Sequence, residues 1–519
     1  MLPDQLANES SLNLGDDMLN WLDRAIGVFA PGVEAKRLAD RIKVDQIRQF
    51  AAAKNLRASG DWRPIDTDIN SLIRSGSEVI RNRTAQLVND FAYFARAVNN
   101  LVDFTVGEGI TFQSQVMRGT GKGGKLEPDK RARQQIEDAR KWWMDEADAA
   151  GKSHYHEIEQ VWKRQDVMAG ESIIVKVWDK TPGLYLPYTL QMYQSDWLNS
   201  DYSKATDRDT LLDQGVEFNR RTGRVVAYHF MVPDGLNKWS GTNKAKRILA
   251  ADVIHGFKLL QPGQLRGVTP FTPAILLADD LQEYLGANID RAKMAAKWLA
   301  FVETDDAATW KKGTNEDSTL TLDNAIIEFL KAGEKVNINT ADVPGETFTP
   351  TTKLLLQMLA ISVNVPYEML SGDYGGLNYN TMRTVRNDFA KFNRPVIKRH
   401  CRQFGTQVNR GFFDALYLSG KVDMPGYLDD PRHWQAGVWQ PPGVEPLDLL
   451  RESRGHIDLV DNLLFSPQEI IAARGRDAEE VLNEAKEFKE MRVERGLDML
   501  ATSKALQTNP AVVAGGKKK

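Results

Sequence analysis

The feature that most constrains the fold is a long amphipathic pattern over residues 270–302. Acidic residues gather near its start and basic residues near its end, which suits the helix dipole. Thr272 can cap this helix, and Pro273 can occupy its first position. Apolar side chains recur at helical spacing at Leu277, Leu281, Leu285, Ile289, Ala292, Ala296 and Leu299. The pattern predicts a helix of roughly 30 residues and 45 Å, which is long for a globular protein.

A polar, turn-rich segment at 303–349 separates this helix from a second one. The second helix passes through Leu354, Met358 and Ile361 and ends at Val365 and Pro366. A short β-like piece at 326–329 lies inside the polar segment. The arrangement predicts a pair of long helices joined by a protruding polar excursion.

In the rest of the chain, segments with a helical pattern alternate with segments typical of strands. We therefore expect an α+β fold that is predominantly helical. Residues 14–110 read as amphipathic helix, with one stripe at Leu19, Leu22 and Ile26 and another at Leu87, Phe91, Phe94 and Val98. Residues 129–145 predict a further helix, and residues 171–257 a β-rich module with a hairpin at 216–228. A long helix after 381 carries Pro395 as a kink and an apolar face of Phe389, Phe392, Val396, Phe404, Val408 and Phe412. The last 70 residues are helical and charged, and we expect the lysine-rich end at 515–519 to be disordered.

Composition excludes several classes of protein. With 67 basic and 70 acidic side chains the net charge is −3, so the chain lacks the basic surplus of a protein that grips nucleic acid. It either does not touch DNA or touches DNA without holding it. The lone Cys401, expected to be a buried thiol, excludes a disulfide framework and suits a reducing compartment. No apolar run reaches the roughly 18 residues of a membrane span, and the N-terminus does not resemble a signal peptide.

Two local motifs suggest chemistry, but neither is complete. Residues 119–125 fit G-x-G-x-x-G and nearly fit a P-loop, yet Leu126 stands where a hydroxyl would ligate Mg²⁺. A flexible basic surface loop is favoured there over nucleotide binding. His154 and His156 beside Glu157 and Glu159 offer metal ligands, but the H-E-x-x-H spacing is absent. We therefore favour exposed helix residues at that position.

Six separated segments together resemble the lambda-type phage portal family. In chain order they are 95–100 with 106–110, Gly170 with Glu171, 222–229, 255–257 with 261–268 and Pro273, 365–370 with 378–383, and 439–442. The resemblance spans about 90 to 445 and is weaker at both ends.

The resemblance implies a portal fold assembled as a ring, with each part of the chain assigned a place. Residues 1–264 would form the wing, 265–302 the first stem helix, 303–349 the clip and 350–370 the second stem helix. Residues 371–381 would form the tunnel loop, 382–435 the return to the wing, and 436–519 the crown with the basic tail.

The resemblance also implies partners, with no cofactor and no membrane. About twelve copies would form the ring at one vertex of the virion capsid, after assembly in the host bacterial cytoplasm. Double-stranded DNA would pass through the ring without sequence specificity during packaging and ejection. The large terminase subunit would dock on the clip, and a head–tail adaptor, the major capsid protein and scaffold would also contact the ring. Candidate clip contacts are Trp310, Lys311, Lys312, Glu316 and Asp317.

Candidate channel residues lie in the stem and the glycine-rich tunnel loop. Arg291, Lys293 and Lys297 would give the stem rings of positive charge, or would serve only as helix-dipole partners on a solvated face. Asp373, with bulky Tyr374 and Tyr379, would make a repulsive constriction, unless the tyrosines pack on a neighbouring subunit. Asn378 and Asn380 belong to the same loop.

Two other functions remain open on the sequence. The main alternative is another structural protein of the phage particle, such as a head–tail adaptor. Adaptors are usually far shorter than this chain. An enzyme would require a nucleotide site at 119–125 or a metal-dependent nuclease centre at His154 and His156.

Overall fold

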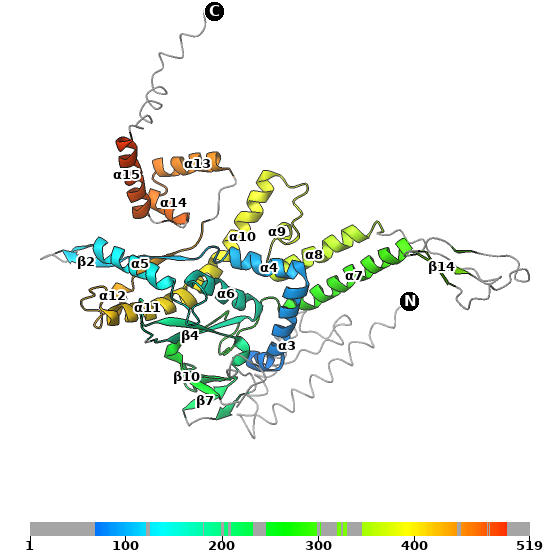
Figure 1. The fold of residues 1–519 in the computed structure, drawn as a ribbon, viewed down its shortest axis with the longest axis horizontal. Coiled ribbons are helices and arrows are strands. Elements are labelled where there is room, and N and C mark those ends of the chain that lie inside the picture. Colours follow the sequence, from blue (N-terminus) through cyan, green and yellow to red (C-terminus); the bar gives the residue numbers. More distant parts are fainter. Residues whose placement is uncertain are drawn as a thin grey trace, which may run out of the picture. The chain divides into compact units, whose positions relative to one another are not determined.

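The computed structural model describes residues 68–120, 125–179, 181–198, 202–205, 209–231, 245–297, 301–302, 319–322, 325–329, 345–443, 448–474, 476 and 478–495. The chain divides into two units, and the described elements all belong to the second, Ile69–Lys519 (Figure 1). They form a mixed α+β fold that is mostly helical, as predicted. The predicted stripe at Leu19, Leu22 and Ile26 and the terminus at 515–519 lie outside the described residues. None of the described helices is long and apolar enough to cross a membrane.

The first described helices are α3 (Ile69–Asp90) and α4 (Ala92–Asp103), which meet at Phe91. The predicted stripe of Leu87, Phe91, Phe94 and Val98 is buried throughout, which confirms this part of the pattern. Glycines at 107 and 109 then take positive φ and lead into strand β1 (Thr111–Ser114), as the sequence predicts.

The predicted β-rich module forms two antiparallel sheets. The first has the order β11-β4-β5 and contains β4 (Glu171–Val177), β5 (Thr189–Tyr193) and β11 (Val253–Phe257). The second has the order β10-β9-β8-β7-β6 and contains β6 (Lys204–Ala205), β7 (Thr210–Asp213), β8 (Val216–Asn219), β9 (Val225–Phe230) and β10 (Lys246–Leu249). Two short 3-10 turns, η2 (Ser195–Trp197) and η4 (Ala250–Asp252), accompany the strands. The predicted hairpin is the β8–β9 pair, with Gly223 at φ +69° in its loop.

A buried ion pair joins strand β4 to the segment that precedes helix α7 (Ile275–Lys297). Arg266 is fully buried, and its Nε donates to both carboxylate oxygens of Glu171 at 2.9 Å. His255 Nε2 lies 3.1 Å from the same carboxylate, and the Gly267 amide donates to it at 3.0 Å. Burial alone would raise the pKa of Glu171, but Arg266 and His255 hold it well below its ordinary value. Two of the segments quoted for the family resemblance therefore meet at this pair.

A second buried cation, Arg140, lies at the centre of the largest apolar core. It belongs to α5 (Lys130–Met144), which packs with α6 (Tyr155–Met168), and its Nη1 donates to Asn409 Oδ1 at 2.7 Å. Its guanidinium lies 5.0–5.9 Å from the ring centroids of Phe112, Trp143, Tyr155, Phe412 and Trp439. Because Trp439 belongs to β15 (Gly437–Gln440), which pairs antiparallel with β1, the cage ties a late segment of the chain to an early one.

The predicted long helix after the glycine-rich loop has three parts. Helix α10 (Tyr379–His400) passes into a π-helical turn, η6 (Cys401–Gly405), and then into α11 (Thr406–Ser419). The expected apolar face is buried at Phe389, Phe404, Val408 and Phe412, but Phe392 is 45% exposed, so the prediction is wrong there. The departure from α-helical geometry lies at η6, beyond Pro395. Cys401 is half-buried, and burial raises the pKa of its thiol to about 12.

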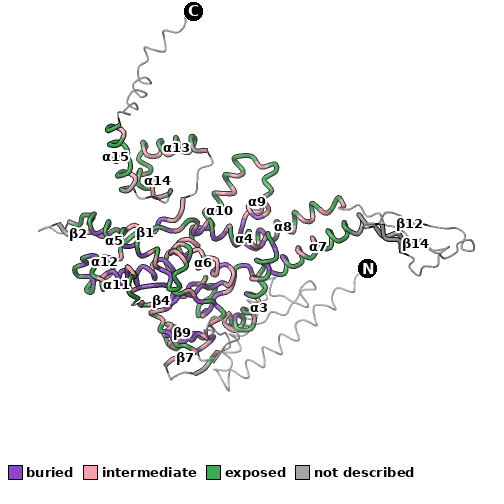
Figure 2. Tube along the Cα trace, in the orientation of Figure 1, coloured by how far each residue is buried: buried purple, intermediate pink, exposed green. Residues whose placement is uncertain are grey.

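The C-terminal part of the described chain contains α12 (Pro431–Trp434), α13 (Leu449–Asp461), α14 (Pro467–Ala473) and α15 (Ala478–Glu494). The last three are largely exposed, whereas strands β4, β5 and β11 are largely buried (Figure 2). The C-terminal region is helical and charged in its described part, as predicted.

Candidate functional site

Two helices run side by side and lead toward a small sheet (Figure 1). They are α7 (Ile275–Lys297), preceded by the 3-10 turn η5 (Thr272–Ala274), and α8 (Phe348–Val363). Tyr284 of α7 stacks on Phe348 of α8 with ring centroids 6.0 Å apart. The paired helices around an intervening segment agree with the sequence pattern, and their assignment to a stem stays a prediction.

The first of these helices differs from the prediction at both ends. Its 23 residues give roughly 35 Å instead of 45 Å. The Thr272 hydroxyl donates to the Thr269 carbonyl and does not cap the helix. Phe301–Val302 is strand β12, which pairs with β14, so residues 301–302 are not helical. Pairing with a distant strand overrides the helical periodicity there.

The basic candidates on α7 occupy its last third. Arg291 and Lys293 are exposed, and Lys293 Nζ lies 3.1 Å from Asp290 Oδ1. Lys297 is the last residue of the helix, and its side chain lies outside the described residues. The dipole acts within the last turn, so it explains neither Arg291 nor Lys293.

The segment between α7 and α8 includes a three-stranded sheet of β12, β14 and β13. The predicted β-like piece is β14 (Ala325–Phe329), which pairs antiparallel with β13 (Thr319–Leu322). The candidate clip contacts lie outside the described residues: Trp310, Lys311, Lys312, Glu316 and Asp317.

The glycine-rich loop joins α9 (Tyr367–Ser371) to α10 and is shorter than predicted. Tyr379 is the first helical residue and Asn380 the second, so only 372–378 is loop. Asn378 caps α10, because its Oδ1 accepts from the Thr381 amide at 2.9 Å. Two of the candidate channel residues are therefore held in a regular helix.

Asp373 is tied to its surroundings by both carboxylate oxygens. Oδ1 accepts from the Gly375 amide at 3.1 Å, and Oδ2 accepts from the Tyr367 hydroxyl at 3.3 Å. Lys353 Nζ of α8 lies 4.0 Å from Oδ2 and 5.5 Å from the Tyr367 ring centroid. Lys353 and Asp373 are each about half exposed, so their attraction is weak. The predicted repulsive charge is thus partly balanced by a lysine that sequence reasoning did not find.

The start of the loop also lies against α4. Gly372 adopts φ +75°, and a Cβ at that position would lie 3.1 Å from the Arg96 guanidinium. The Asn100 side-chain amide donates to the Met369 carbonyl at 3.2 Å. The two tyrosines, Tyr374 and Tyr379, are 47% and 37% exposed. The loop therefore presents aromatic side chains to solvent from a base fixed on α4 and α8.

Neither of the two chemistry motifs is supported by its surroundings. Strand β2 (Met117–Thr120) pairs antiparallel with strand β3 (Lys125–Pro128). A P-loop requires a helix to begin where strand β3 lies, so this strand pairing argues against a P-loop. Within the part of the chain that the structure describes, no group of three His, Cys, Asp or Glu side chains is suited to a metal ion.

The expectation that the residues around His154 are exposed is wrong for Glu159. His154 caps α6, whereas Glu159 is buried, with His156 Nδ1 at 3.1 Å and His400 Nε2 at 3.0 Å from its oxygens. The Ile110 amide also donates to it at 3.1 Å. Burial would raise the pKa of Glu159, and these hydrogen bonds bring it below its ordinary value. The cluster is a structural tie between α6 and α10.

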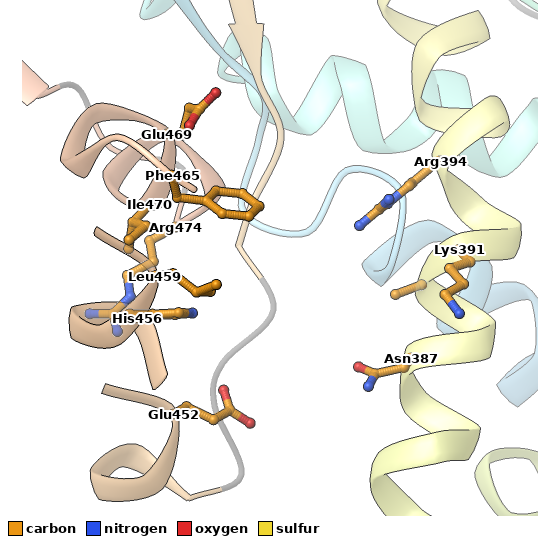
Figure 3. Close-up of a pocket in the computed structure, with 11 residues that line it drawn as sticks. Asn387, Lys391, Arg394, Glu452, His456, Leu459, Phe465, Glu469, Ile470 and Arg474 are labelled. Carbon is orange, nitrogen blue, oxygen red and sulfur yellow. The ribbon is translucent and has the colours of Figure 1, made fainter. Parts of the chain in front are cut away.

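A hollow of about 480 Å³ lies between α10 and the helices α13 and α14 (Figure 3). Its α10 side carries Asn387, Lys391 and Arg394, which face Glu452, His456 and Phe465 in Figure 3. It mixes both signs of charge with apolar groups, and sequence reasoning did not find it.

Comparison with known proteins assigns the family. The family model described as "Phage portal protein, lambda family" matches residues 55–394, more than half of the chain. The chain belongs to this family. The probable portal protein of Halomonas phage phiHAP-1 is 24% identical over 460 residues, covering 85% of this chain and 86% of that protein. Portal protein B of Escherichia phage lambda is 21% identical over 345 residues, covering 60% and 64%.

Solved structures with some likeness come from gene transfer agent particles. A chain in the neck of an empty particle gives a TM-score of 0.38 at 16% identity, covering 80% of this chain and 96% of that one. A chain of the native particle gives 0.35 at 14% identity. Family membership itself makes the chain a structural component of the phage virion and not an enzyme. The predicted family is therefore confirmed, and the adaptor and nucleotide-enzyme alternatives are set aside.

Proposed function

We propose that the chain assembles into a closed ring of about twelve subunits at one capsid vertex, through which double-stranded DNA enters and leaves. The exposed apolar side chains of the paired stem helices carry this proposal. Ile361 of α8 is 77% exposed, and Leu354 and Met358 lie on the same helix at helical spacing from it and are also exposed. On α7, Leu276 and Ile289 are exposed as well. Much of the surface of both helices is exposed in Figure 2. A ring needs a contact that closes on itself from copy to copy, and apolar faces on long helices provide such a surface.

The described elements support the following places in the ring. Helices α7 and α8 form the stem, and the β12–β14 sheet belongs to the clip, where the large terminase subunit docks. The loop between α9 and α10 forms the tunnel loop, and α13–α15 belong to the crown. A head–tail adaptor, the major capsid protein and scaffold contact the outside of the ring.

The charge of the chain suits a conduit. Twelve copies at −3 give a formal −36 for the ring, so DNA meets net repulsion overall. Contacts with phosphate must then be local and replaceable, which lets the duplex slide. Exposed Tyr374 and Tyr379 narrow the passage, and Asp373 adds a negative charge that Lys353 partly balances.

Replacing Asp373, Tyr374 and Tyr379 together with alanine is expected to leave ring assembly intact and to reduce DNA retention in particles at least about tenfold. The physical reason is that all three side chains are exposed and none belongs to the buried core, so the variant loses the constriction and only the surface contacts of Asp373 with Tyr367, Gly375 and Lys353. The measurement is the yield of DNA-filled particles against empty ones, with ring mass determined in parallel.

The matched control replaces three exposed residues away from the loop, Leu418, Leu428 and Asp429. It should keep the wild-type yield of filled particles. Unchanged DNA retention in the loop variant would contradict the proposal that these three side chains form a constriction.

A further inference from the structure

Helix α10 has one face fixed to the body of the protein. Phe389 packs edge-to-face on Phe104 with ring centroids 4.6 Å apart. Arg399 Nη2 donates to buried Asp166 at 2.8 Å, and His400 Nε2 lies 3.0 Å from buried Glu159. These contacts hold the helix in one orientation, so its opposite face is presented in a defined direction.

The opposite face carries a row of basic side chains. Residues three and four positions apart share one face of a helix, and this spacing continues past the end of α10 along Arg383, Asn387, Lys391, Arg394, Lys398 and Arg402. Helix α10 contains six basic residues and one acidic residue, a formal +5, in a chain whose total is −3. The overall balance of charge therefore hides a strong local surplus.

Most of this positive charge has no strong partner among the described residues. Arg394, Lys398 and Arg402 are exposed and form no ion pair with another described residue. Lys391 Nζ lies 3.8 Å from Asp388, but both side chains are about 70% exposed, so the pair is weak. Arg383 lies 3.9 Å from Glu452. Lys391 and Arg394 also line the hollow that faces α13 and α14. A polyanion that reaches the row would not have to break a strong ion pair.

We propose that this row binds the phosphate backbone of double-stranded DNA beyond the tunnel loop. The inference rests on the proposed function, because α10 begins where the loop ends. From Arg383 to Arg402 the row extends about 29 Å, most of one turn of B-form DNA at about 34 Å. Positive groups at helical spacing without a base-reading pocket contact phosphates at any sequence. The row supplies the local, exchangeable contacts that a sliding duplex requires.

The test replaces Lys391, Arg394, Lys398 and Arg402 with glutamine in the full-length protein. Binding of a fluorescent 40-base-pair duplex is followed by anisotropy over a salt series. The slope of log affinity against log salt is expected to fall by about 0.9 for each phosphate that the variant no longer neutralises. Affinity at low salt is expected to fall by at least about tenfold.

The charge-matched control replaces exposed Arg131, Lys141, Lys152 and Lys258 with glutamine and should keep the wild-type slope. Ring mass is measured on each variant, so a failure of assembly and a failure of DNA binding are distinguished. If the fourfold variant does not assemble, the four single variants carry the test, each with its own decrease in slope.

Three outcomes overturn the inference while leaving the ring proposal standing. One is an intact ring with no duplex binding at any salt concentration, and another is an equal decrease in slope in the control variant. The third is an unchanged slope together with faster proteolysis after residue 443. That result would indicate that the row binds the acidic residues of α13 and α14 and not DNA.

Discussion

Replacing Arg266 with alanine is expected to lower the free energy of unfolding by about 3–5 kcal/mol. The side chain is fully buried, and its Nη1 donates to the Leu198 carbonyl at 2.7 Å while Nη2 donates to the Ser195 carbonyl at 3.1 Å. Alanine would leave Glu171 as a buried charge without its main partner, and would leave these carbonyl groups without a donor. The measurement is the urea midpoint of the purified protein.

The matched control is Arg476→Ala, which removes an arginine whose ion pair with Glu484 is about half exposed. It should change stability by no more than about 0.5 kcal/mol. The pH dependence has a definite sign, because the pKa of Glu171 is lowered in the folded protein. The contribution of the pair is full above the unfolded pKa of about 4.3 and is lost as the pH falls below it. Equal urea midpoints for Arg266→Ala and Arg476→Ala would contradict the importance of the buried pair.

Replacing Gly170 with alanine is expected to cost more than about 3 kcal/mol, because a Cβ there would overlap backbone. The added atom would lie 2.0 Å from the Val268 carbonyl carbon and 2.2 Å from the Thr269 nitrogen. Neither backbone atom can rotate away as a side chain could. Soluble yield and the urea midpoint of the variant measure the effect.

The control for backbone strain alone is Gly223→Ala. Gly223 has a similar positive φ of +69°, against +83° at Gly170, and nothing lies within 4 Å of the position that an added methyl group would take. This variant should cost only about 1–2 kcal/mol, the ordinary penalty of a left-handed alanine. If both variants lose the same stability, close approach of the backbones is not what requires glycine at 170.

Features that depend on local sequence can be predicted well. Helix α5 begins after Asp129 as expected, because Asp129 accepts from the Ala132 amide and apolar residues follow at helical spacing. The β8–β9 hairpin follows from two β-rich runs around a loop that ends on Gly223. The residues that determine each of these elements lie close together in the chain, so a single sequence is enough to predict the element.

Features that depend on distant pairing cannot be predicted in this way. Glu159 is 241 positions from His400, and nothing near either residue shows that they meet. Periodicity alone puts the end of α7 too late, because residues 301–302 pair with β14, which only the folded chain reveals. Periodicity also puts Phe392 in the core, but its side chain is 45% exposed.

The candidate site could be predicted from the sequence only in part. The glycine-rich loop and the stem pair are visible as patterns in the sequence, but the Lys353–Asp373 contact is not. The basic row of α10 is regular in its spacing and could have been predicted from the sequence. The near-neutral net charge of the whole chain masks it.

The most direct test of the proposed ring is the mass of the purified protein in solution, with the same fraction imaged by negative-stain electron microscopy. Twelve subunits of 58.3 kDa give about 700 kDa under closed ring symmetry. We expect a particle of that size with a central hole. A single species at the mass of one subunit, or an open helical assembly, would contradict the proposal.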